Sequence, residues 1–187
     1  MTHEIVPGSI ADICQQENVS LEESFLTCDC VILFDVSGSM FCKDKSGKSR
    51  YDRGVEELKS LQASMPGKIA LIQFAGTPEF VPGGMPYSMG SGNTNLTQAL
   101  KYIRIADVPD MSFILISDGE PDNERSALEE AKKFQNRIDT VYIGDADDGG
   151  SKFMKRLAKA SGGSAIDSAA EHISAEVKTL LLGTGQR

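Results

Sequence analysis

The apolar run Val31-Ile32-Leu33-Phe34 is followed at once by Asp35-Val36-Ser37-Gly38-Ser39-Met40. A short, continuous apolar run is typical of a strand that is buried on both faces of a sheet. The residues that follow place one carboxylate and two hydroxyls at alternate positions, namely Asp35, Ser37 and Ser39. All three are hard oxygen donors, which suit Mg²⁺, Mn²⁺ or Ca²⁺ better than thiophilic metals. The stretch therefore predicts a buried strand that delivers a metal-binding loop to the surface.

Strands and helices alternate along the chain from Cys28 onwards. Apolar runs predict further strands at 69–74, 113–116 and 138–143, with short strands at 80–81 and 165–166. Apolar residues at helical spacing predict helices at 55–65, 96–103, 127–134, 152–160 and 169–182. This alternation predicts an α/β fold, a doubly wound and mainly parallel sheet of Rossmann-like type with helices on both faces. Ligands of such sheets bind beyond the carboxyl ends of the strands, where the strand order reverses.

Residues 1–26 come before this alternation and carry one local signal. Ser20 with Glu23 three residues later predicts the start of a helix with a capping box. We expect residues 1–26 to form an N-terminal extension that packs on the edge of a domain formed by residues 27–187. A partner-binding arm is the functional alternative for this extension.

The composition limits the class of partner. The chain has 187 residues, which suits one domain of moderate size, and a formal net charge of −8 at pH 7. An acidic surface repels phosphate groups, so nucleic acid is an unlikely partner and an anionic membrane is disfavoured. The first residues do not form a signal-peptide pattern, and no stretch has the roughly 18 consecutive apolar residues of a spanning helix. We therefore expect a cytoplasmic protein without membrane contact, whose oligomeric state the sequence leaves open.

Four cysteines, Cys14, Cys28, Cys30 and Cys42, stand in the first quarter of the chain. Their spacing differs from the C-x₂₋₄-C pairs of zinc sites. Because side chains alternate along a strand, Cys28 and Cys30 are expected on one face. Buried reduced thiols are the favoured interpretation, and a zinc site is the alternative.

Two further loops carry oxygen donors at element boundaries. Gly92-Asn93-Thr94-Asn95 comes just before the helix at 96–103, and Ser117-Asp118-Gly119 follows the strand at 113–116. Taken singly, each loop could be only a helix cap or a turn. Together with the first loop they resemble, in order and rough spacing, the metal-ion-dependent adhesion site of von Willebrand factor type A (vWA) domains. The resemblance covers about residues 28 to 182.

The resemblance implies a vWA fold with a complete metal site. Ser37 and Ser39 would bind the ion directly through their hydroxyls, and Thr94 would bind it directly or through water. Asp35 and Asp118 would balance its charge, often through water. The ion would be Mg²⁺, with Mn²⁺ or Ca²⁺ as alternatives, and one coordination position would stay open. In the family a protein partner's Asp or Glu carboxylate typically takes that position.

We therefore predict a metal-dependent protein-interaction module, an intracellular adaptor and not an enzyme. A metal-assisted hydrolase is the first alternative, although it needs a general base near the metal, for which only Glu120 can be argued. An RNA-binding vWA protein is the second alternative, and the acidic balance disfavours it. Ser46-Gly47-Lys48-Ser49 does not predict a nucleotide-binding loop, because the Walker pattern requires glycine where this chain has Cys42.

Large apolar side chains flank the predicted metal loops. They are Phe41, Met85, Tyr87 and Met89. Exposed at the surface, such residues would serve a partner interface. Folded inwards, they would extend the core, and the sequence does not separate these two alternatives.

Overall fold

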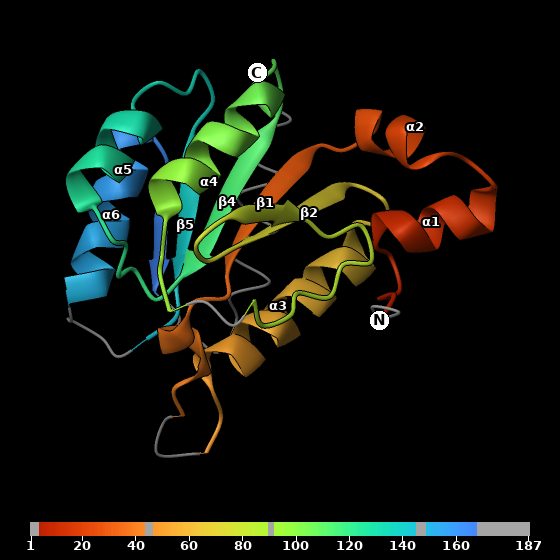
Figure 1. The fold of residues 1–187 in the computed structure, drawn as a ribbon. Helices are drawn as coiled ribbons and strands as arrows, with labels where there is room; N and C mark the ends of the chain where they lie inside the picture. The colour runs from red at the N-terminus through yellow and green to blue at the C-terminus, as the bar shows by residue number, and fades with distance from the viewer. Residues whose placement is uncertain (1–3, 44–46, 90–91, 145–148, 168–187) are drawn as a thin grey trace.

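The computed structural model describes residues 4–43, 47–89, 92–144 and 149–167. Within these ranges six strands form one sheet in the order β3-β2-β1-β4-β5-β6 (Figure 1). The strands are β1 (Cys30–Asp35), β2 (Ile69–Phe74), β3 (Pro78–Phe80), β4 (Ser112–Ser117), β5 (Ile138–Tyr142) and β6 (Ala165–Asp167). The helices are α1 (Ile10–Glu17), α2 (Leu21–Leu26), α3 (Arg50–Ser64), α4 (Leu96–Ile103), α5 (Glu124–Ala131) and α6 (Gly149–Ser161), with 3₁₀ turns η1 (Gly38–Phe41) and η2 (Arg104–Ala106).

The sheet is doubly wound about its central strand, β1. This strand pairs in parallel with β2 on one side and with β4 on the other, and β5 and β6 continue in parallel beyond β4. Only β3 runs antiparallel, at the edge beside β2. The predicted α/β class and mainly parallel sheet are therefore confirmed. The strand order reverses between β1 and β4, so the carboxyl ends of these two strands form the switch point.

Helices cover both faces of this sheet. In Figure 1, α4, α5 and α6 lie against one face and α3 lies against the other. All six residues of β1 are buried, with Val31 and Leu33 in one core cluster and Ile32 and Phe34 in the other. Burial on both faces explains why this strand is a continuous apolar run and not an alternating pattern. Within the described ranges, no helix combines the length and apolar character needed to cross a membrane.

The N-terminal segment packs on the sheet edge through backbone hydrogen bonds. Val6 N–H donates to the Gly83 carbonyl and Ala11 N–H to the Pro82 carbonyl, each at 2.9 Å. The capping box predicted at the start of α2 is present, with Ser20 as its N-cap. The sequence reasoning missed the short helix α1. The predicted helix at 169–182 lies outside the described residues.

The prediction that Cys28 and Cys30 lie on one face of a strand was wrong. Cys28 lies two residues before β1 and joins the cluster beneath α4, whereas Cys30 starts β1 and joins the cluster beneath α3. Asp29 and Cys30 both donate their backbone N–H to the Lys68 carbonyl, so regular strand alternation does not extend back to Cys28. All four cysteines are reduced. Cys28 and Cys30 are buried, while Cys14 is half-buried and Cys42 is exposed.

The close contact of α3 with the sheet yields a first prediction. Gly54 lies on the buried side of α3, and a Cβ there would come within 2.8 Å of the Phe34 ring and 3.0 Å of Ile143. Because Phe34 is fully buried, we expect Gly54→Ala to lower the free energy of unfolding by about 1–3 kcal/mol. Urea denaturation measures this change.

The matched control for this prediction is Ser60→Ala on the exposed side of the same helix. We expect the control to leave stability unchanged or to raise it by a few tenths of a kcal/mol. A Gly54→Ala protein that gains about 1 kcal/mol, as helix propensity alone would give, would contradict the packing argument.

Candidate metal site

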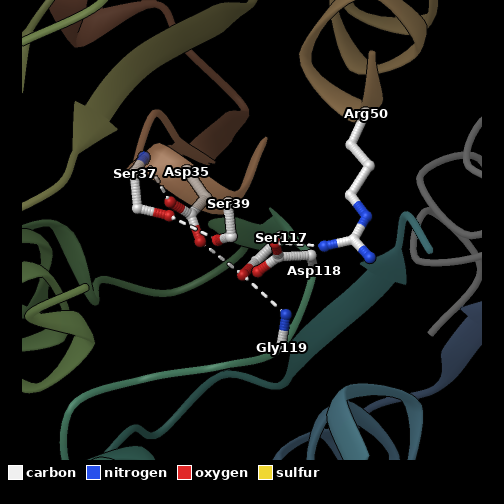
Figure 2. A network of polar contacts seen from close by, with 7 residues as sticks. All are labelled: Asp35, Ser37, Ser39, Arg50, Ser117, Asp118 and Gly119. Atoms are coloured by element: carbon white, nitrogen blue, oxygen red, sulfur yellow. Dashed lines mark hydrogen bonds and ion pairs between the residues drawn. The ribbon is translucent and has the colours of Figure 1, made fainter. Parts of the chain in front are cut away.

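The first loop of the candidate site begins where β1 ends. Asp35 is fully buried, and its Oδ1 accepts the Ser37 N–H at 2.8 Å. The 3₁₀ turn η1 then brings the Ser37 and Ser39 hydroxyl oxygens to 3.2 Å from each other (Figure 2). Adjacent oxygen ligands of an octahedral Mg²⁺ lie about 3 Å apart, since each is about 2.1 Å from the ion. The two hydroxyls therefore have a spacing that suits one shared cation.

The register between β1 and β4 joins this loop to the third one. Phe34 is paired with Ile116, so Asp35 comes beside Ser117. The Ser117 hydroxyl donates to Asp35 Oδ2 at 2.6 Å and accepts the Gly119 N–H at 3.0 Å. Gly119 has a φ of +75°, and a Cβ there would meet the Gly150 carbonyl at 2.4 Å, so this turn requires glycine. The tight turn holds Asp118 beside the first loop.

Asp118 is buried and only partly satisfied. Its Oδ2 accepts a 2.8 Å hydrogen bond from Nη1 of Arg50, the first residue of α3 (Figure 2). Its Oδ1 is buried and has no hydrogen-bond partner in residues 4–43, 47–89, 92–144 and 149–167. An unpaired buried carboxylate oxygen is costly, and native structures avoid it unless a ligand or an ion completes the site. A cation or its bound water at this oxygen would complete the site.

The backbone of the second loop forms hydrogen bonds with two other segments, the turn after β4 and the end of β2. Thr94 is buried. Its N–H donates to Asp122 Oδ1 at 3.0 Å, and its carbonyl accepts the Asp122 N–H at 3.0 Å. Asn95 N–H donates to the Ala75 carbonyl just beyond β2, and the Asn95 side chain caps α4. Asn95, and not Thr94, is therefore the N-cap of this helix.

The second loop also lies close to the first. A Cβ built on Gly38 would be 3.8 Å from Gly92 Cα. The loops of Asp35, Thr94 and Asp118 therefore lie together, beyond the carboxyl ends of the parallel strands.

Burial and like charge perturb the first aspartate. The pKa of Asp35 is raised from 3.8 to about 6, mainly because burial disfavours the charged form. Hydrogen bonds from Ser117 and Ser37 oppose this change, and the nearby charge of Asp118 adds to it. A divalent cation would relieve both the burial cost and the repulsion.

The donor set as a whole fits a hard divalent cation. It offers the hydroxyls of Ser37 and Ser39 at a suitable spacing, the unpaired oxygen of Asp118, and Asp35 and Thr94 on the adjoining loop ends. Within the described ranges, no three His, Cys, Asp or Glu side chains form a metal-binding group. The predicted set contains only two carboxylates, so its metal affinity would depend on hydroxyl and water ligands.

Three supporting residues were not predicted from the sequence. Ser117 connects the two aspartates, Arg50 holds Asp118, and Asp122 fixes the threonine loop.

Three of the flanking apolar residues pack inwards, whereas Phe41 stays exposed at the surface. Met85, Tyr87 and Met89 pack on the core cluster beneath α3, and Phe41 stacks on Tyr51 with ring centroids 4.7 Å apart. Ser49, in the segment that imitates a phosphate loop, is the N-cap of α3.

Comparison with solved structures supports the fold. The protein BatB from Bacteroides thetaiotaomicron, described as a conserved hypothetical protein, matches with a TM-score of 0.62 and 14% identity over 84% of this chain and 98% of its own. The manganese-loaded TRAP protein of Plasmodium vivax matches with a TM-score of 0.52 and 19% identity over 71% of this chain and 63% of its own. No protein-family model and no curated protein matches the sequence. These likenesses show a vWA-like fold.

The raised pKa of Asp35 predicts how stability depends on pH. The folded pKa lies above the unfolded value, so stability from this group is present below about pH 4 and lost as pH rises through about 6. Without divalent ions, we expect Asp35→Asn to raise the free energy of unfolding at pH 7.5 by about 1–2 kcal/mol, because the amide carries no buried charge.

Urea denaturation of both proteins in EDTA at pH 4.5 and 7.5 tests this prediction. The difference between wild type and Asp35→Asn should shrink at the lower pH, where Asp35 is protonated. A variant less stable than wild type at pH 7.5 would contradict it.

Proposed function

We propose that the chain is a metal-dependent protein-interaction module. A divalent cation, Mg²⁺ or alternatively Mn²⁺ or Ca²⁺, would be held by Ser37, Ser39 and Thr94, with Asp35 and Asp118 balancing its charge. When bound, the ion supplies an open coordination position that accepts an Asp or Glu carboxylate of a protein partner. The rest of the binding would come from the surface around the three loops.

One observation carries the proposal: the buried Oδ1 of Asp118 has no hydrogen-bond partner within the part of the chain that the structure describes, and the nearby hydroxyls of Ser37 and Ser39 lie about one octahedral edge apart. The loops of Asp35 and Asp118 follow β1 and β4, the two strands at the switch point where α/β proteins bind ligands, which supports the proposal. A structural neighbour with this fold, the TRAP protein, is manganese-loaded, which supports a divalent ion.

The role of an intracellular adaptor is part of the same proposal. The net charge of −8 opposes contact with an acidic partner surface, and a shared cation converts that repulsion into an attraction. We propose a cytoplasmic location and assign no catalytic step to the site. Both Asp35 oxygens accept hydrogen bonds and the residue is fully buried, so it is poorly placed to take a proton from a substrate.

Metal binding should stabilise the fold. A ligand that binds only the native state raises its stability, so 10 mM Mg²⁺ or 1 mM Mn²⁺ should raise the melting temperature by roughly 2–5 °C over EDTA. The Ser37→Ala, Ser39→Ala double variant should lose this rise. Differential scanning calorimetry makes the measurement, and an unchanged wild-type melting temperature would count against an occupied site.

The effect of Asp35→Asn on the stability of the protein should depend on whether the metal ion is present. Asp35→Asn is expected to be the more stable protein in EDTA and to gain less from the ion, since it has lost one negative charge.

Partner capture tests the interaction itself. Immobilised wild-type protein should retain its partners in Mg²⁺ and release them in EDTA, whereas Asp35→Ala and Thr94→Ala should retain none in either buffer. Glu129→Ala, which removes an exposed carboxylate from α5, is the matched control and should behave as wild type. Partners held equally in Mg²⁺ and EDTA would overturn the metal-bridged interaction, and phosphoester or peptide hydrolysis lost in Asp118→Ala would favour an enzyme instead.

A further inference from the structure

The ion pair between Arg50 and Asp118 brings a fixed positive charge into the candidate metal site. Arg50 begins α3, and its side chain reaches the β4–α5 turn, 68 residues away in sequence. The guanidinium Nη1 lies 2.8 Å from Asp118 Oδ2, and the Asp118 side chain is fully buried while Arg50 is about one quarter exposed. The pair is therefore shielded from water on the carboxylate side and open on the arginine side.

The geometry leaves room for the arginine and a metal ion together. Arg50 occupies one oxygen of Asp118, and the other oxygen has no hydrogen-bond partner in the described part of the chain. A cation can therefore use Oδ1, directly or through water, while Arg50 keeps Oδ2. Arg50 would then remain part of the site in both its empty and its metal-loaded state.

Counting charges shows what this arginine does to the site. Asp35 and Asp118 carry two negative charges, and Arg50 reduces the net charge of the empty site to −1. A divalent ion brings the loaded site to +1, which one carboxylate ligand neutralises. Without Arg50 the empty site would carry −2 and the loaded site 0.

The surroundings strengthen the positive side of this balance. Arg50 also lines a small pocket of about 130 Å³ whose other side chains include Lys43, Lys48 and Arg53. Lys48 forms an ion pair with Glu56, so that residue contributes little net charge. Glu120 and Asp122 lie exposed on the turn after Asp118, where solvent screens them more than the buried pair.

We propose that Arg50 is a specificity-determining residue of the metal site, which weakens metal binding and strengthens binding of a monoanionic carboxylate to the loaded site. The inference rests on the proposed function. It adds that the protein gives up some metal affinity in exchange for a loaded site that attracts an acidic partner residue. Metal binding and partner binding would then strengthen each other, because the ion makes the site positive and the partner's carboxylate neutralises that charge.

Arg50→Gln tests this inference, because glutamine keeps a polar side chain at this position but carries no charge. We expect Arg50→Gln to bind Mn²⁺ more tightly than wild type, by roughly fivefold or more at low salt, in titrations followed by electron paramagnetic resonance. At saturating Mn²⁺, acetate should bind the variant more weakly by a similar factor, measured by paramagnetic relaxation of the acetate protons. Both differences should shrink at 0.5 M NaCl.

Two controls separate charge from position. Arg50→Lys keeps the charge and should stay close to wild type in both titrations. Arg104→Gln removes the same charge at the far end of α4 and should change neither affinity.

The outcomes divide cleanly. Opposite changes in the Mn²⁺ and acetate affinities of Arg50→Gln support the inference. Changes in the same direction, or an Arg50→Lys protein that loses metal affinity as Arg50→Gln does, would show a purely structural role and overturn it. If wild type binds no Mn²⁺ at all, the proposed function itself fails, and the inference fails with it.

Discussion

The parallel pairing of β1 with β4 sets two aspartates side by side beneath the protein surface, and the rest of the site depends on this arrangement. Two buried like charges destabilise a fold unless donors or cations face them. Asp35 accepts hydrogen bonds from the Ser37 amide and the Ser117 hydroxyl, and Asp118 accepts one from Arg50. Among the described residues, the second oxygen of Asp118 has no hydrogen-bond partner. The donors and cations among the described residues therefore neutralise these two aspartates only in part.

Much of the fold could be predicted because its signals are local. The central strand is buried on both faces, so it is a continuous apolar run, and helices α3 to α6 repeat apolar residues at helical spacing. Short elements were less predictable. The eight-residue helix α1 buries only Ile10, which leaves almost no periodicity to detect. Cys28 was misplaced because strand alternation was extended over residues that precede the strand.

The candidate ligands could be predicted, but the contacts that hold them could not. Each ligand residue sits in a short pattern at the end of a strand or the start of a helix, and sequence displays such patterns directly. Ser117 is 82 residues from Asp35, and Arg50 is 68 residues from Asp118. These pairs depend on strand register and on where α3 begins, which no local pattern specifies. Arg50 in particular lies before the helix that the sequence predicts at 55–65, whereas α3 begins at Arg50.

The distribution of hydrogen bonds favours holding an ion over performing chemistry. A general base needs a lone pair that can reach a substrate, and both oxygens of Asp35 already accept hydrogen bonds in a fully buried position. Asp122 is closer to solvent, but its Oδ1 fixes the threonine loop. Oδ1 of Asp118 has no hydrogen-bond partner among the described residues, and the hydroxyls of Ser37 and Ser39 contact each other at a spacing that would suit a cation. This arrangement supports the proposal that the site binds an ion.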